Sequence, residues 1–278
     1  MQYYSRDIPL DYAAAGLVPP EKQSKITLYN PDNVSEAVPR RRAVVVLCPG
    51  GGYSFVAPRE GEPIALQYLA ADIAVVELTY AVYPSRFPVA LFELAATVRW
   101  IRENAEALQI DPARVIVSGF SAGGHLAASL CVYWNQDFLA RGLGCGGPAI
   151  QPNGAILCYA VISGEQGIGH RGSLEALYGA GYTQDQERAF SLEKQVGPHC
   201  PPTFLWHTAA DTVVPAANSL CYAEALGGYG IPFELHIYPW GEHGLSLATA
   251  AVDIPETPQT NSLRLWPSLA IEWIKRQF

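Results

Sequence analysis

The stretch Arg114-Val115-Ile116-Val117-Ser118-Gly119-Phe120-Ser121-Ala122-Gly123-Gly124-His125 indicates the fold of this chain. Its apolar first half is typical of a buried β-strand, and the Gly-x-Ser-x-Gly pattern leads directly into an expected helix over about 122–132. A sharp strand-to-helix turn lifts a serine hydroxyl above the sheet edge and points free helix N–H groups at its reaction partner. A side chain at Gly119 or Gly123 would crowd so tight a turn. Ser121 is therefore the candidate nucleophile.

A glycine run upstream supplies the first part of the context that this short pattern needs. The apolar segment 43–48 is an expected strand, and it ends in Pro49-Gly50-Gly51-Gly52. Glycines let backbone N–H groups approach a ligand closely, so the amides of Gly51 and Gly52, with that of Ala122, are candidates for an oxyanion hole. The alternative is an ordinary flexible loop after a strand.

An acid and a base follow later strands in the chain. Asp211 comes a few residues after an expected strand at 203–207, although it could instead cap a helix that begins near Ala216. His243 lies in a glycine-flanked loop after the expected strand 233–238. Glu242 is the runner-up acid, but side chains of adjacent residues diverge. The order Ser, Asp, His differs from that of the chymotrypsin and subtilisin types.

With these motifs the chain resembles an α/β-hydrolase of the carboxylesterase branch, related to the hormone-sensitive lipases. It is most similar to the bacterial group of acetyl-xylan and feruloyl esterases. The resemblance runs from about residue 25 to the end, and it rests on the motifs at 49–53, 78–84, 119–125, 207–211 and 242–244. Lipase-like relatives carry His before the glycines; Pro49 in that place favours the sugar-ester subgroup.

Continuous apolar strands alternating with helices predict a mainly parallel, doubly wound sheet with helices on both faces. We expect residues 1–278 to form one α/β-hydrolase domain after an irregular opening, with a variable, pocket-shaping insertion at about 163–202. That insertion could equally be a surface excursion. Besides the strand that leads to Ser121, the expected strands are 25–29 (at the sheet edge), 43–48, 73–78, 154–162, 203–207 and 233–238. The expected helices are 63–71, 89–108, 122–132 and one from about 263, with Pro267 in its opening turns.

The resemblance implies a serine carboxylesterase that cleaves short acyl esters with a Ser121–His243–Asp211 triad and needs no metal or other cofactor. Its subgroup points to acetylated xylo-oligosaccharides as substrates. Four aromatic residues are candidates for stacking on sugar rings, or they are packing residues: Tyr53, Phe55, Tyr80 and Tyr83. Two other functions stay open: an amide-cleaving enzyme of this fold, such as a peptidase or arylformamidase, and a non-catalytic binding protein.

Composition limits the partners. The formal net charge of −8 argues against nucleic acid and anionic membranes, and no apolar run is long enough to span a bilayer. The first residues lack a secretory pattern, so we expect a cytoplasmic protein, and a homo-oligomer stays open. Six scattered cysteines are expected to be reduced thiols. Among the other histidines, His125, His207 and His236 are expected to be structural. His170 and His199 lie in the variable region, where either could contact substrate.

Overall fold

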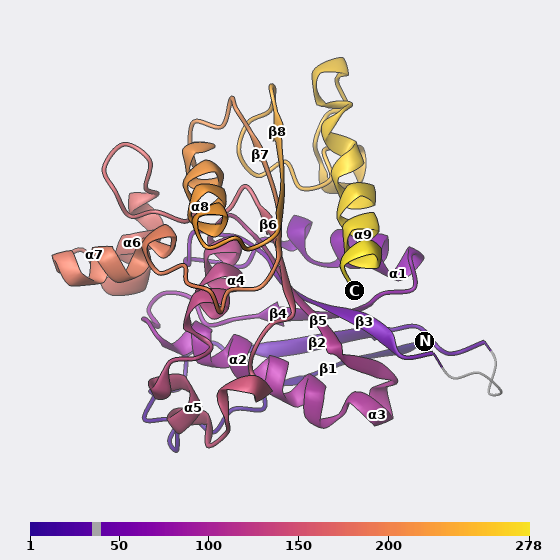
Figure 1. Ribbon diagram of the computed structural model, residues 1–278, viewed down its shortest axis with the longest axis vertical. Helices are drawn as coiled ribbons and strands as arrows, with labels where there is room; N and C mark the ends of the chain where they lie inside the picture. Colours follow the sequence, from indigo (N-terminus) through magenta and orange to yellow (C-terminus); the bar gives the residue numbers. More distant parts are fainter. Residues whose placement is uncertain (35–39) are drawn as a thin grey trace.

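A computed structural model describes residues 1–34 and 40–278. Among these residues, eight strands form one twisted sheet in the order β1-β2-β4-β3-β5-β6-β7-β8 (Figure 1). The strands are β1 (Gln2–Asp7), β2 (Lys25–Asn30), β3 (Arg42–Cys48), β4 (Ala74–Thr79), β5 (Ile110–Phe120), β6 (Gly154–Cys158), β7 (Thr203–Thr208) and β8 (Phe233–Tyr238). From β4 to β8 every neighbouring pair is parallel, whereas β1 and β2 are antiparallel to their neighbours.

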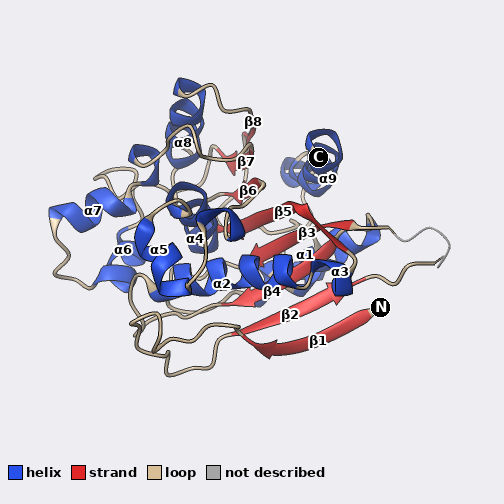
Figure 2. Ribbon diagram, turned by 60° about the horizontal axis from the view of Figure 1, so that its bottom comes forward, coloured by secondary structure: helices blue, strands red, loops and turns tan. Residues whose placement is uncertain are grey.

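Helices pack against both faces of this sheet (Figure 2). They are α1 (Glu62–Ala70), α2 (Val89–Glu103), α3 (Ala105–Leu108), α4 (Ser121–Tyr133), α5 (Asp137–Leu143), α6 (Arg171–Tyr178), α7 (Gln184–Phe190), α8 (Ala217–Gly228) and α9 (Trp266–Gln277). Six 3-10 turns are also assigned in the described part of the chain, among them η1 (Pro58–Glu60), η3 (Leu192–Lys194) and η6 (Leu263–Leu265). The predicted doubly wound α/β-hydrolase fold is confirmed.

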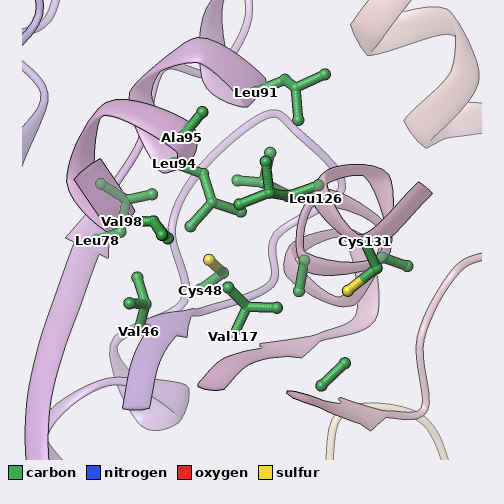
Figure 3. Packing of buried hydrophobic residues seen from close by; sticks show 14 of the residues in the cluster. Val46, Cys48, Leu78, Leu91, Leu94, Ala95, Val98, Val117, Leu126 and Cys131 are labelled. Carbon is green, nitrogen blue, oxygen red and sulfur yellow. The ribbon is translucent and has the colours of Figure 1, made fainter. Parts of the chain in front are cut away.

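The alternation of side chains along β3 explains why both faces are covered. Val44 and Val46 belong to a buried cluster with residues of α2, α4 and α8, whereas Val45 and Leu47 belong to a second cluster with residues of α1 and α9. Figure 3 shows the first cluster, in which Val46 and Cys48 lie beneath α2 and α4. Successive strand residues point to opposite faces, so a strand buried on both sides must be apolar throughout.

Several predicted elements differ from the observed ones. The opening is not irregular, because β1 pairs with β2, and β2 is therefore not the edge strand. All six residues of β1 are exposed, so it lacks the apolar alternation that reveals a strand. The helix predicted over 89–108 ends at Glu103, and Asn104 separates it from α3. The strand predicted to reach 162 ends at Cys158, because Tyr159 has a left-handed backbone (φ 37°).

Glu93 of α2 is a fully buried carboxyl that accepts hydrogen bonds from the Ala81 backbone N–H (2.6 Å) and the Tyr12 hydroxyl (2.7 Å). Burial raises its pKa from 4.5 to about 7. Folding therefore stabilises the protonated form of the Glu93 carboxyl. This contribution to the free energy of unfolding is fully present below about pH 4.5 and is lost as the pH rises to about 7. The loss is on the order of 3 kcal/mol.

We therefore expect Glu93→Gln to reduce the fall in the free energy of unfolding between pH 4.5 and pH 7.5. Urea denaturation of both proteins at several pH values measures it. Glu103→Gln, an exposed carboxyl on the same helix, is the matched control and should keep the wild-type dependence. An unchanged pH dependence in Glu93→Gln would contradict the assignment.

Candidate active site

Ser121 lies where β5 turns into α4, with a left-handed backbone (φ 51°) that only a tightly constrained turn enforces. Gly119 and Gly123, two residues before and after the serine, have no room for a side chain. A Cβ on Gly119 would lie 2.1 Å from the carbonyl oxygen of Gly123, and one on Gly123 would lie 2.1 Å from that of Cys48. The turn is therefore of the kind that exposes a serine hydroxyl at the carboxyl end of a central strand.

Three side chains that follow the strands β5, β7 and β8 form a hydrogen-bond chain at this edge of the sheet. His243, in the loop after β8, places Nε2 2.8 Å from the Ser121 Oγ and Nδ1 2.6 Å from Oδ2 of Asp211. Asp211 lies in the loop after β7. An ionised carboxylate only accepts, so Nδ1 carries the proton that it donates to Asp211, and Nε2 is free to accept the serine proton.

Asp211 is held by more than His243. Its Oδ1 accepts from the backbone N–H groups of Val213 (3.0 Å) and Val214 (2.9 Å), and its side chain is buried. Burial alone would raise the pKa of Asp211, but hydrogen bonds from His207 and His243 outweigh it and hold that pKa well below the usual range. The carboxyl is therefore ionised throughout the neutral range and can orient the imidazole.

His207 fixes the loop that carries the acid. It is fully buried, its Nε2 donates to the carbonyl of Val214 (2.7 Å), and its Nδ1 accepts from the Ser219 hydroxyl (2.8 Å). This is the structural role expected for it. Glu242 is exposed, and its side chain has no ion pair or hydrogen bond with the residues that the structure describes. The acid that contacts His243 is Asp211, not the runner-up.

The backbone N–H groups of Gly51, Gly52 and Ala122 have no acceptors among the described residues. Gly51 and Gly52 line the same pocket as Ser121, and Ala122 follows Ser121 directly in the chain. Gly51 (φ 129°) and Gly52 (φ 62°) adopt backbone conformations that suit glycine. A Cβ on Gly51 would lie 2.0 Å from the Phe55 carbonyl oxygen. Ala122 is in the first turn of α4, where N–H groups are free of intrahelical partners. These donors are available to a ligand oxygen.

A pocket of about 400 Å³ opens over these groups. Its walls come from residues 49–52 (the glycine loop), the start of α4, the His243 loop and the segment before α6. The lining residues are Gly51, Gly52, Ser54, Phe55, Ala57, Arg59, Glu60, Ser121, His170, Gly172, Val213, His243 and Gly244. Among the residues that the structure describes, no cluster of three or more His, Cys, Asp or Glu side chains is arranged to hold a metal ion.

Of the four aromatic residues proposed for sugar stacking, Phe55 lines this pocket and the three tyrosines do not. Tyr53 and Tyr80 are each 2% exposed, and their hydroxyls bond His125 Nδ1 (2.8 Å) and the Pro49 carbonyl (2.7 Å). Tyr83 is 55% exposed and lies under the guanidinium of Arg86. Substrate stacking conflicts with these positions for Tyr53 and Tyr80, which are packing residues, because both rings belong to the buried core cluster.

Glu60 is a site residue that sequence reasoning missed. Its buried carboxyl accepts from the Gly50 N–H (2.7 Å) and the Tyr159 hydroxyl (2.6 Å), and that hydroxyl accepts from the Ser246 N–H (3.1 Å). Glu60 and Tyr159 together thus connect the glycine loop to the loop that carries His243. Burial raises the pKa of Glu60. No local motif marks this residue, since its partners are far away in the sequence.

Comparison with known proteins identifies the family of this chain. A family model described as alpha/beta hydrolase fold matches residues 45–247, so the chain belongs to the α/β-hydrolase fold family. In structure it is similar to an acetyl ester-xyloside bifunctional hydrolase from Caldicellulosiruptor lactoaceticus. The TM-score is 0.81 and the sequence identity 34%, over 97% of this chain and 92% of that one.

Two curated proteins are similar to this chain in sequence. The chain is 35% identical over 212 residues to endo-1,4-beta-xylanase B of Butyrivibrio fibrisolvens, covering 75% of this chain and 33% of that protein. It is 27% identical over 232 residues to the acetylxylan esterase of Xylanibacter ruminicola, covering 82% and 45%. The chain thus spans between a third and a half of the length of these two relatives. The resemblance inferred from the motifs is confirmed.

Across the part of the chain that the structure describes, no helix is both long and apolar enough to cross a bilayer. All six cysteines are free, and four of them, Cys48, Cys131, Cys158 and Cys200, are buried, in keeping with the reduced thiols expected from their scattered positions.

Proposed function

We propose that the protein is a serine carboxylesterase that cleaves short acyl esters, with acetylated xylo-oligosaccharides as its substrates. The observation that carries the proposal is the hydrogen-bond chain from Asp211 through His243 to Ser121, beside three backbone N–H groups that have no acceptor among the described residues. A nucleophile, a base, an orienting acid and a set of oxyanion donors are the groups that acyl transfer needs.

In the proposed mechanism, His243 Nε2 takes the Ser121 proton as Oγ attacks the ester carbonyl carbon. Asp211 holds the imidazole in the required tautomer and stabilises its charged form. The tetrahedral intermediate collapses, and the imidazolium gives its proton to the departing alcohol oxygen. Water then enters, His243 takes one of its protons, and attack on the acyl-enzyme releases the carboxylic acid and restores Ser121.

The N–H groups of Gly51, Gly52 and Ala122 are proposed to stabilise the oxyanion of both intermediates. Such donors act most strongly where they are already oriented, and loss of one in a comparable enzyme lowers kcat roughly 10²- to 10³-fold. The left-handed backbone at Gly52 and the lack of space beside Gly51 support a fixed loop at this place. Glu60 supports it further through its bond to the Gly50 N–H.

The substrate class rests on the relatives and on the pocket. The relatives' names assign an acetylxylan esterase activity to one protein and an acetyl ester-xyloside hydrolase activity to another. A pocket of about 400 Å³ open to solvent suits a short acyl group on a larger alcohol. The segment 163–202 is proposed to shape this pocket, since it contributes His170 and Gly172 to the wall.

The two alternatives have less support. Peptidases and arylformamidases share the fold, but the similar proteins named above include an acetylxylan esterase and an acetyl ester-xyloside hydrolase, whose names favour ester cleavage. A binding protein without catalysis has no need of an aligned serine, histidine and aspartate.

Hydrolysis of p-nitrophenyl esters from acetate to decanoate, beside acetylated xylo-oligosaccharides and an aminoacyl anilide, tests the proposal. We expect the highest kcat/KM among the p-nitrophenyl esters for acetate, and acetate release from the sugar, because the pocket is small. Anilide cleavage, or a preference for decanoate, would contradict it. No turnover of any of these by a folded protein would favour the binding-protein alternative.

A further inference from the structure

A second histidine faces the pocket beside the proposed triad. His170 is the residue before α6, and its ring lies alongside the glycine loop, with Cε1 3.9 Å from where a Cβ on Gly52 would be. The ring is half-buried and lines the same pocket as Ser121 and His243. The mechanism described above gives it no part, and His170 is therefore a pocket group without an assigned role.

The hydrogen bonds of His170 determine which ring nitrogen carries the proton. Nδ1 accepts from the backbone N–H of Ser173 (3.2 Å), and a backbone N–H can only donate. The Ser173 hydroxyl lies 2.8 Å from the same nitrogen. Nδ1 is therefore the unprotonated nitrogen of a neutral ring, and the proton is on Nε2. Nε2 has no hydrogen-bond partner among the residues that the structure describes.

The surroundings keep this ring neutral. Burial and the positive charge that His243 can carry both lower the pKa of His170, although Asp211 partly opposes them. A protonated ring would also place an Nδ1–H against the Ser173 N–H, so the bond that caps α6 would be lost. At neutral pH the pocket therefore presents one fixed N–H donor from His170.

An acetyl ester has few oxygen atoms that could accept a hydrogen bond from the Nε2–H of His170. The ester group has only two oxygens: the carbonyl oxygen faces the amides of the glycine loop and Ala122, and the bridging oxygen receives its proton from His243. The acetyl methyl has no acceptor. Any further acceptor within reach of the pocket must therefore belong to the alcohol, and in an acetylated sugar the hydroxyl and ring oxygens supply it.

We propose that His170 is a specificity-determining residue whose Nε2–H donates a hydrogen bond to an oxygen of the sugar that carries the acetyl group; this rests on the function proposed above. The donor distinguishes a polyhydroxyl alcohol from a plain aryl or alkyl alcohol, because the plain alcohols leave Nε2–H without a partner in the complex. A site that hydrogen-bonds a substrate hydroxyl discriminates against analogues that lack it.

The test compares kcat/KM for an acetylated xylo-oligosaccharide with kcat/KM for phenyl acetate, whose alcohol has no acceptor besides the ester oxygen, in wild type and in His170→Asn. Asparagine is a good N-cap, so its Oδ1 can still accept from the Ser173 N–H, whereas its short side chain withdraws the donor from the pocket. We expect the sugar-to-aryl ratio to fall about tenfold, the effect of losing one neutral hydrogen bond.

His199→Asn is the matched control. His199 belongs to the same 163–202 segment, is half-buried and contacts the Val132 carbonyl (2.9 Å), away from the pocket. It should leave the sugar-to-aryl ratio at the wild-type value. In His170→Asn, a higher KM for the sugar at a wild-type melting temperature would show that His170 binds the sugar and does not merely cap α6.

The outcomes separate the two proposals. If wild type releases acetate from the sugar and His170→Asn keeps the wild-type ratio, the role of His170 is overturned and the esterase function stands. Equal losses on both substrates also overturn it, since His170 would then act on the reaction and not on the alcohol. If wild type cleaves only the aryl ester, the substrate class fails and the inference fails with it.

Discussion

Replacing Ser121 with alanine is expected to lower kcat for p-nitrophenyl acetate by at least roughly 10⁴-fold, because no acyl-enzyme can form without the hydroxyl. The loss should appear in kcat, since Ser121 contributes one small group to the pocket. The fold should persist: the left-handed backbone at Ser121 (φ 51°) is available to alanine at a modest cost. Steady-state kinetics with a melting temperature for each protein measure both expectations.

Ser129→Ala is the matched control for this substitution. Ser129 is also a buried serine of α4, two turns beyond Ser121, and its hydroxyl donates to the His125 carbonyl (2.8 Å). It should retain kcat within a few-fold of wild type. Turnover by Ser121→Ala above a thousandth of the wild-type rate would remove Ser121 from the mechanism.

Replacing Asp211 with asparagine is expected to lower kcat about 10⁴-fold, the size of effect seen for the equivalent change in a serine protease. The isosteric amide can keep its oxygen at the Oδ1 position, where it still accepts from the Val213 and Val214 N–H groups. Its NH₂ then faces His243 and donates to Nδ1, so Nε2 becomes the protonated nitrogen. That tautomer cannot take the Ser121 proton.

The control for Asp211→Asn is Glu242→Gln, which removes the charge of the acid adjacent to His243. Because this exposed side chain does not contact the imidazole in the described structure, kcat should change less than threefold. The reverse pattern, a large loss in Glu242→Gln and a small one in Asp211→Asn, would exchange the roles of the two acids.

The central strands and the serine turn could be predicted from the sequence because local physics determines them. Strand β3 is apolar at every position from Ala43 to Cys48, since both faces are covered, and a Cβ at Gly119 or Gly123 would overlap the backbone. The triad candidates were also visible, because residues at the carboxyl ends of parallel strands meet at one sheet edge.

Other features were hidden because distant contacts decide them. Strand β1 has no buried face, so only its pairing with β2 makes it a strand. Tyr53 and Tyr80 follow the glycine loop and the strand β4 in sequence, yet their rings turn into the core. Glu60 reaches the pocket through the 3-10 turn η1, which no sequence periodicity predicts. A substrate contact by His170 was one possibility in the sequence, and only the path of the chain before α6 places it in the pocket wall.

Covalent trapping tests the central claim, that Ser121 is the nucleophile of an ester hydrolase, most directly. The protein is incubated with diethyl p-nitrophenyl phosphate, which phosphorylates an activated serine and releases p-nitrophenol, and is then examined by intact-mass and peptide mass spectrometry. The account predicts one diethylphosphoryl group per chain, on Ser121, together with loss of esterase activity, and none on Ser121→Ala. No adduct, or an adduct on another residue such as Ser54 that accompanies the loss of activity, would contradict it.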